Sequence, residues 1–238
     1  MEVSLPFPAP GRTGKKEALT QSEQVAEWLR TDIISCRLMP AAKLNIATLA
    51  DERGVSLGAV REALAGLASE GLVVAEPQRG YRVSPVSSRS LSELVQARIH
   101  IEGLCLTEAI RHGDLRWETA CLLALERLKQ AGAGLSGPDA VEEQVRAHGE
   151  FHHALVSGCN NEWLLRMQHF LYQQSERYRR LSVPLGGPPR DIDAEHAALV
   201  EAALARDADR ARQLLEQHLS TTARNILTSP HLNLGLRP

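Results

Sequence analysis

The stretch from Asn45 to Leu72 constrains the fold most, because it predicts two short helices joined by a tight turn. Asn45 and Ser56 are suitable N-cap residues for the two helices, and Gly54 can end the first helix in the left-handed conformation. Apolar residues recur at helical spacing in both segments. This pattern is typical of a helix-turn-helix, whose second helix enters the DNA major groove. An ordinary corner between two core helices fits the same residues.

The residues that follow predict a β-hairpin and favour the DNA-binding interpretation. Residues 72–75 and 81–84 are short β-type runs, and the turn 76–80 between them contains proline and glycine. A hairpin directly after the second helix is the wing of a winged helix-turn-helix. We expect DNA contacts at the start of the second helix and at the wing, from Ser56, Gly58, Ala59, Arg61, Arg79, Gly80 and Arg82.

Length and cysteine usage indicate a two-domain cytoplasmic protein. The 238 residues suit two domains of ordinary size. The four cysteines are scattered without a Cys-x-x-Cys pair, which predicts buried thiols and no disulfide or zinc framework. Because the sequence has no apolar run of about eighteen residues and no signal-peptide core, we expect no membrane partner.

The charge balance argues against strong nonspecific binding to nucleic acids. The formal net charge is −2, and residues 1–86 carry ten Lys and Arg against ten Asp and Glu. An operator-binding protein with this composition must cluster its cations on one side, and a dimer doubles them.

Changes of pattern along the chain predict the domain organisation. Residues 1–18 form a flexible arm, 19–86 the winged helix-turn-helix, 87–90 a linker, 91–228 a helical effector, metal-binding and dimerisation domain, and 229–238 a tail. Capping boxes at Thr20–Glu23 and Ser90–Glu93 open the first helix of each domain. The second domain has six predicted helices, at about 91–112, 115–130, 139–157, 162–182, 190–205 and 208–227. The predicted fold class is therefore mainly α, with an N-terminal winged helix-turn-helix and small β-hairpin followed by an all-α six-helix antiparallel bundle.

Four histidines are predicted to point into the core of this bundle. His148 and His152 are spaced i, i+4 on the third helix, and His196 and His218 lie among apolar residues of the fifth and sixth. A single core histidine is usually satisfied by a carbonyl or water, but four together are best satisfied by a shared divalent metal. We expect these four as the metal ligands, with zinc or nickel preferred. Glu195 lies off the apolar face and is expected to face solvent.

Together these features resemble a GntR-family transcription regulator of the FadR type with an FCD effector domain, in the VanR-like branch. The matching segments at the DNA end are residues 49–56, 60–64, 67, 70–72 and 79–81. In the effector half the matching residues are Arg98, Glu102, Phe151, His152, Leu155, Asn161, Glu195, His196 and His218. The resemblance implies a homodimer that reads a palindromic operator in double-stranded DNA, with Arg61 contacting bases or phosphates. It also implies a metal, held by an aspartate and three histidines, over which a small organic acid binds.

Two departures from the family pattern affect these expectations. His148 occupies the aspartate position, which keeps a ligand, removes a negative charge and favours an anionic effector. Leu57 stands where the family often has arginine, so one guanine-reading cation is missing.

Arg98 and Asn161 are the candidate effector-binding residues. A guanidinium at Arg98 suits a carboxylate, although an intrahelical pair with Glu102 fits the same spacing. For Asn161, a role as the N-cap of the helix that begins at residue 162 is favoured over a ligand contact.

The sequence thus predicts a ligand-responsive DNA-binding regulator, a repressor in preference to an activator, and not an enzyme. A structural metal bundle without an effector is one alternative. A mononuclear metalloenzyme using the four-histidine site is another, but the apolar faces offer no evident Asp or Glu as a general base.

Overall fold

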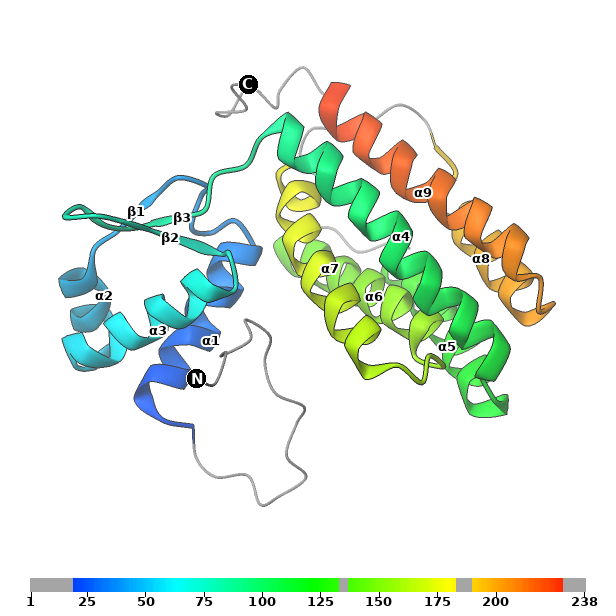
Figure 1. Cartoon of the computed structure of the whole chain (residues 1–238), viewed down its shortest axis with the longest axis horizontal. Helices are drawn as coiled ribbons and strands as arrows, with labels where there is room; N and C mark the ends of the chain where they lie inside the picture. Colours follow the sequence, from blue (N-terminus) through cyan, green and yellow to red (C-terminus); the bar gives the residue numbers. More distant parts are fainter. Residues whose placement is uncertain (1–18, 133–136, 183–189, 229–238) are drawn as a thin grey trace, which may run out of the picture. The chain divides into compact units, whose positions relative to one another are not determined.

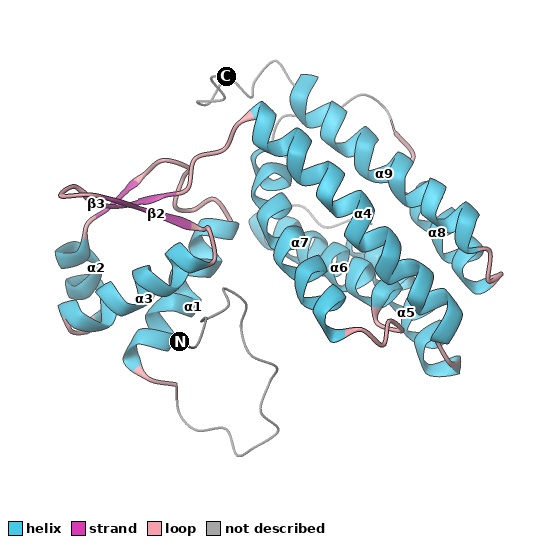
Figure 2. Cartoon of the chain, viewed as in Figure 1, coloured by secondary structure: helices cyan, strands magenta, loops and turns pink. Residues whose placement is uncertain are grey.

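The computed structural model describes residues 19–132, 137–182 and 190–228, which fold into nine helices and three short strands (Figure 1). Helices dominate, with the strands confined to one small sheet (Figure 2). The elements in chain order are α1 (Gln21–Ile34), β1 (Lys43–Leu44), α2 (Ile46–Arg53), α3 (Leu57–Ser69), β2 (Val73–Glu76), β3 (Gly80–Val83), α4 (Ser88–His112), α5 (Leu115–Gly132), α6 (Pro138–Val156), α7 (Glu162–Ser182), α8 (Ile192–Leu204) and α9 (Ala208–Thr228). The predicted fold class is confirmed.

The described residues form two compact units. The first comprises residues 19–91 together with 173–182, and the second comprises 92–172 and 190–228. Helix α7 therefore contributes residues to both units. In the described ranges, no helix combines the length and the apolar character that crossing a membrane requires.

The helix-turn-helix of the first unit begins and ends at the residues that the sequence indicates. The Asn45 side chain accepts hydrogen bonds from two backbone N–H groups of α2, and Gly54 ends that helix at φ 62°. The Ser56 hydroxyl then accepts from the first turn of α3. These caps satisfy backbone groups that a helix end leaves unpaired, so the turn between α2 and α3 is locally determined.

The apolar faces of the helices form one core in the first unit. Helix α1 packs against α3, and the strands cover the same core. The core includes Val25, Leu29, Ile33, Leu49, Val60, Leu64, Leu67, Leu72 and Val83. Because α3 buries only this stripe, its opposite face stays at the surface.

The wing has three strands, one more than predicted. Strands β2 and β3 pair antiparallel, with Glu76 opposite Gly80 at the turn. Strand β1 pairs with the other edge of β3, which gives the order β1-β3-β2. A strand of two residues is too short to show alternation, so the sequence pattern could not reveal β1.

The second unit holds most of α4, all of α5, α6, α8 and α9, and the first part of α7, and the bounds of these helices are close to those predicted. The start of α4 is an exception, because the helix begins at Ser88. The Ser87 hydroxyl accepts from the Ser90 N–H at 3.1 Å. The prediction that Ser90 opens this helix is therefore wrong by one turn. Helix α5 packs against α6 and α8, and α8 packs against α9.

Candidate functional site

Four histidines meet inside the second unit, at the positions predicted. His148 and His152 come from α6, His196 from α8 and His218 from α9. One candidate ligand atom of each lies within 4.8 Å of those of the other three. His152 and His196 are each 1 % exposed and His218 is 4 % exposed, while His148 is half-buried. The helices thus gather four imidazoles around one point.

Aromatic packing holds the rings close to one another. Ring centroids are 4.7 Å apart for His148 and His152 and 4.8 Å apart for His196 and His218. The Phe151 ring packs on His196 with centroids 4.6 Å apart. His148 Nδ1 and the Tyr172 hydroxyl are 3.3 Å apart, which adds a polar contact from α7.

Three buried ring nitrogens have no hydrogen-bond partner among the described residues. They are Nε2 of His152 and both nitrogens of His196. Leaving such an atom unpaired costs about 1–3 kcal/mol. A zinc ion bound tetrahedrally at about 2.0–2.1 Å requires its nitrogens about 3.4 Å apart, so the cluster needs only a small contraction. The residues present therefore fit a divalent transition metal.

Two of these histidines are held in their neutral form. Burial lowers the pKa of His196 to about 2, and the nearby His218 and His152 rings lower it further. Burial also lowers the pKa of His218 to about 4, against the opposing effect of its hydrogen bond to Glu195. Neutral imidazole is the form that binds metal ions, so near pH 7 both rings are ready to act as ligands.

A buried carboxylate, Glu102 of α4, contacts one histidine directly. Its Oε1 lies 2.8 Å from His152 Nδ1, and Arg98 Nη2 donates to its Oε2 at 2.7 Å. The Glu102 side chain is 2 % exposed. Burial alone would raise the pKa of Glu102, but the Arg98 guanidinium and the contact with His152 outweigh it and lower the pKa to about 2. Glu102 is thus an ionised carboxylate beside the histidine cluster.

Glu195 contacts a second histidine, and the prediction that it faces solvent is wrong. Its Oε2 lies 3.0 Å from His218 Nδ1, and Arg190 pairs with both of its oxygens. Burial alone would raise the pKa of Glu195, but the bonds from His218 and Arg190 lower it to about 2. Helical periodicity placed this residue off the apolar face of α8, and the bond forms because α9 brings His218 alongside.

The two candidate effector-binding residues have other partners. Arg98 forms the intrahelical pair with Glu102 that its spacing allows, and its guanidinium carbon lies 5.3 Å from the Tyr172 ring centroid. Asn161 accepts from the N–H groups of Trp163 and Leu164 and so caps α7. The structure therefore contains the Arg98–Glu102 pair and the Asn161 cap that the sequence offered as alternatives to effector binding.

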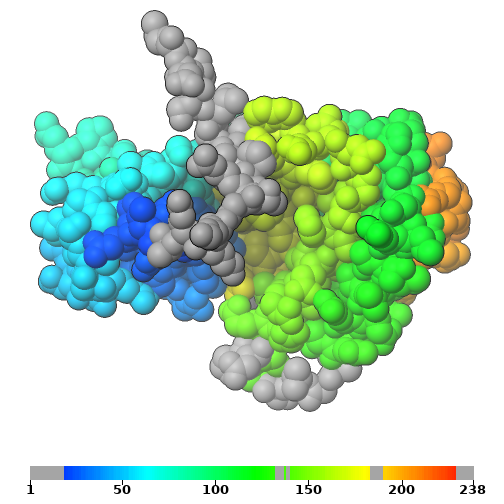
Figure 3. Space-filling model, turned by 90° about the horizontal axis from the view of Figure 1, so that it is seen from below, coloured from blue at the N-terminus to red at the C-terminus, as the bar shows by residue number. Residues whose placement is uncertain are grey.

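Helix α3, which the sequence predicts to be the recognition helix, presents an exposed face opposite its core stripe. Arg61 is exposed on it and makes no ion pair among the residues that the structure describes, and Leu57 and Gly58 are exposed at its start. In the space-filling view the cyan atoms of this region lie at the surface (Figure 3). Ala59 is only 8 % exposed, so its side chain is too buried for the DNA contact that was predicted. Ser56 is exposed, but its hydroxyl is already engaged as the cap.

Of the two arginines predicted to contact DNA from the wing, one is exposed and the other bonds to the sheet. Arg79 is exposed next to Gly80, which has a φ of 91° that suits glycine. Arg82 instead donates to Glu76 at 2.9 Å and to the Ala41 carbonyl at 3.0 Å. Arg82 therefore braces the sheet, and Arg79 is the cation that the wing tip offers.

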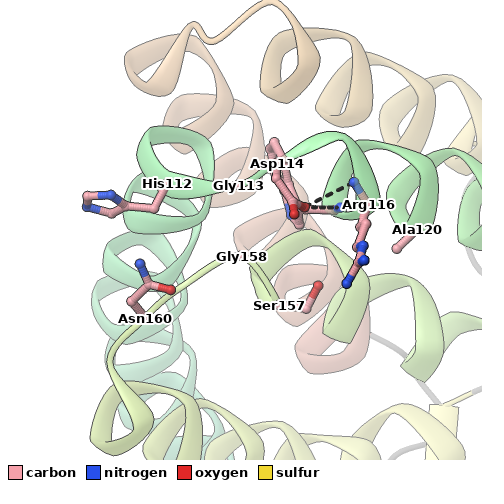
Figure 4. A pocket seen from close by; sticks show the side chains of 9 residues that line it. His112, Gly113, Asp114, Arg116, Ala120, Ser157, Gly158 and Asn160 are labelled. Atoms are coloured by element: carbon pink, nitrogen blue, oxygen red, sulfur yellow. Dashed lines mark hydrogen bonds between the residues drawn. The ribbon is translucent and has the colours of Figure 1, made fainter.

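A shallow pocket of about 380 Å³ lies elsewhere in the second unit, where α4 ends and α5 begins (Figure 4). The Asp114 side chain accepts from the N–H groups of Arg116 and Trp117 and so caps α5. A Cβ at Gly113 would lie 2.3 Å from the Trp117 ring, so close packing requires glycine there. These residues shape helix ends, and none of the four histidines lines this pocket.

Comparisons with known proteins agree with this architecture. The family described as bacterial regulatory proteins, gntR family, matches residues 21–83, and the FCD domain matches residues 93–221. The chain is 37% identical over 202 residues to the uncharacterized HTH-type transcriptional regulator BphR of Paraburkholderia xenovorans, covering 84% of this chain and 82% of that protein. It is 34% identical to the HTH-type transcriptional repressor GlaR of Escherichia coli, covering 82% of this chain and 90% of that protein.

Solved structures share the fold. Escherichia coli McbR/YncC superposes with a TM-score of 0.74 at 23% identity, covering 88% of this chain and 98% of that chain. A GntR regulator from Rhodococcus sp. RHA1 gives a TM-score of 0.70 at 24% identity, covering 88% of this chain and 98% of that chain. From the family matches and the curated relatives, this chain belongs to the GntR family of DNA-binding transcriptional regulators, carries an FCD effector domain and is not an enzyme.

Proposed function

We propose that this regulator is a repressor that binds a palindromic operator as a homodimer and responds to a small organic acid at a metal centre. The observation that carries the proposal is the four-histidine cluster in the effector domain of a chain whose recognition helix exposes Arg61. The name of the relative GlaR, a repressor, supports the direction of regulation.

In the DNA-binding step, the exposed face of α3 enters the major groove. Arg61 contacts base edges or phosphates there, Gly58 lets the helix approach closely, and Arg79 at the wing contacts the backbone or the minor groove. Since the net charge of the chain is −2, affinity depends on these few placed cations. Two copies related by a two-fold axis double them and match a palindrome.

In the effector domain, His148, His152, His196 and His218 hold the metal, with zinc or nickel preferred because imidazole suits both. The metal supplies a positively charged Lewis-acid position for an anionic ligand. The charged side chains beside the cluster already balance, because Arg98 pairs with Glu102 and Arg190 pairs with Glu195. A divalent ion adds two positive charges to these balanced side chains. The resulting positive charge favours binding of an organic anion.

The DNA-binding assignment is tested with Arg61→Ala in the full-length protein. We expect operator retardation to be lost, because a phosphate or bidentate base contact is removed, while metal content and native mass stay unchanged. Arg37→Ala is the matched control, since Arg37 is an exposed arginine of the same unit that pairs with Asp32 outside α3. Normal retardation by Arg61→Ala would show that α3 is not the reading helix.

A structural metal site without an effector is a second candidate, favoured by the deep burial of three of the histidines. It predicts that metal removal lowers the melting temperature and that no small carboxylic acid raises it. A melting-temperature rise of several degrees with one acid from a panel, lost in His152→Ala, supports the effector function instead.

A further inference from the structure

We propose that Glu102 and Glu195 are positioning residues of the metal centre, each fixing one histidine by its Nδ1 so that its Nε2 is the metal ligand. This inference rests on the proposed metal site and goes beyond it, because it assigns ligand atoms and names two carboxylates outside the ligand set.

The hydrogen-bonding inventory of Glu102 fixes the tautomer of His152. Oε2 of Glu102 accepts from the Arg98 guanidinium, and Oε1 lies 2.8 Å from His152 Nδ1, so the carboxylate accepts at both oxygens and Nδ1 carries the proton. Neutral imidazole then has its lone pair on Nε2, which is the buried atom that has no partner among the described residues. Histidine ligands commonly donate their second ring N–H to a carboxylate, which orients the ring and makes the ligand nitrogen more basic.

Arg98 holds Glu102 in this position. Its guanidinium bonds Oε2 through both Nε and Nη2, at 3.2 and 2.7 Å, while Oε1 serves His152. With both oxygens engaged and only 2 % of the side chain exposed, Glu102 has no freedom to rotate away. The chain Arg98–Glu102–His152 therefore links α4 to a ligand on α6.

Glu195 holds His218 at a more exposed place, where Arg190 Nη2 also lies 3.3 Å from His218 Nδ1. The contact with the carboxylate is the shorter of the two, so Nδ1 donates to Glu195. Its Oε2 lies 3.0 Å from His218 Nδ1, and Arg190 braces both oxygens while also donating to the Thr222 hydroxyl. The Glu195 side chain is 31% exposed against 2 % for Glu102. Since water can replace a partly exposed partner, Glu195 contributes less than Glu102.

The contacts of the other two histidines differ from this pattern. Neither nitrogen of His196 is bonded among the described residues, and its ring is held by packing on Phe151. His148 Nδ1 faces the Tyr172 hydroxyl, which can donate or accept. Glu102 and Glu195 contact His152 and His218, respectively.

The test is metal binding by the full-length protein, measured by Zn²⁺ titration against a competing chelator. Glu102→Ala is expected to weaken Zn²⁺ binding by about 10–100-fold, as loss of such a partner does elsewhere. Glu195→Ala is expected to weaken it less. The matched control is Glu201→Ala, because Glu201 is a 70%-exposed glutamate on the same helix as Glu195.

A second readout separates positioning from a role in folding. Glu102→Gln keeps the volume and an oxygen that can accept from Nδ1, so we expect Zn²⁺ affinity between those of wild type and Glu102→Ala. The absorption bands of bound Co²⁺ should shift in Glu102→Ala and return toward wild type in Glu102→Gln, with metal-free circular dichroism unchanged in Glu102→Gln and Glu201→Ala.

Wild-type Zn²⁺ affinity and Co²⁺ bands in Glu102→Ala would overturn the proposal. An unfolded metal-free Glu102→Gln protein would also overturn it, because Glu102 would then act on the fold. If the wild-type protein itself binds neither Zn²⁺ nor Co²⁺, the metal centre fails and the positioning role fails with it, a result distinct from the first two.

Discussion

At the scale of single residues, Leu57 departs most from what a DNA-reading helix usually offers. It is the first residue of α3 and is 47% exposed, and a Cβ added at the following Gly58 would lie in ordinary contact with Ser56 Oγ, 3.7 Å away. Leu57→Arg places a guanidinium at this position, and a bidentate contact to guanine discriminates by about 1–3 kcal/mol. We expect selection from random DNA to return a new guanine in each half-site.

Leu57→Gln is the comparison for that experiment, because glutamine adds hydrogen bonding without charge. It is expected to favour adenine if it changes the selected sequence at all. If Leu57→Arg selects the wild-type operator unchanged, the start of α3 does not face the bases.

The buried thiols are a second feature at this scale. Burial raises the pKa of Cys105 to about 12 and that of Cys121 to about 12. Only the thiolate is nucleophilic, so both should stay unmodified by iodoacetamide at pH 8 in the native protein and react fully in urea. Peptide mass spectrometry reads this out by residue. Native labelling of Cys121 at the unfolded rate would mean that its site opens frequently.

The sequence predicted the four histidines but not their carboxylate partners, and the reason is physical. Periodicity shows which face of a helix a residue occupies, which was enough for His152 and His196. Glu102 meets His152 across 50 positions of sequence and Glu195 meets His218 across 23. Those contacts depend on which helices lie side by side, and the spacing of residues within one helix does not show which helices are neighbours.

At the scale of elements, cap residues made the helix starts predictable. Ser56 starts α3 through one hydrogen bond from its hydroxyl. Ser56→Ala removes that bond and is expected to lower the free energy of unfolding by about 1 kcal/mol. Urea denaturation followed by circular dichroism measures it.

Ser69→Ala serves as the control for the cap, since the Ser69 hydroxyl donates to the Gly66 carbonyl near the end of the same helix. It is expected to change the unfolding free energy by less than about 0.5 kcal/mol. Equal decreases in unfolding free energy in the two variants would mean that the Ser56 cap contributes no more stability than the Ser69 hydroxyl. Strand β1 was not predicted because two residues are too few to show a strand pattern. The start of α4 was misplaced because Ser87 and Ser90 are both suitable cap residues, and in the structure the Ser87 hydroxyl accepts from the Ser90 N–H.

At the scale of the whole molecule, the order of helices and the presence of a wing followed from the sequence, whereas the polar network around the histidines did not. That network makes stability depend on pH. The folded pKa values of His196 and His218 are about 2 and about 4, below the ordinary histidine value of about 6.5. At a pH between the folded pKa values and about 6.5, the unfolded chain binds more protons than the folded chain. The contribution of these histidines to the free energy of unfolding is therefore complete above about pH 6.5 and falls as the pH is lowered.

For the metal-free protein, kept in chelator, we expect unfolding free energy to fall by about 2 kcal/mol for each of these histidines between pH 7.5 and pH 5, because each is then protonated only in the unfolded chain. Urea denaturation at several pH values measures this slope. His218→Gln should reduce the slope by about half, and His153→Gln should leave it unchanged, since His153 is exposed on the same helix as His148. Bound Zn²⁺ should steepen the acid loss further, because protons then compete with the metal for the same nitrogens. A flat profile without metal would mean that the histidine cluster opens to water in solution.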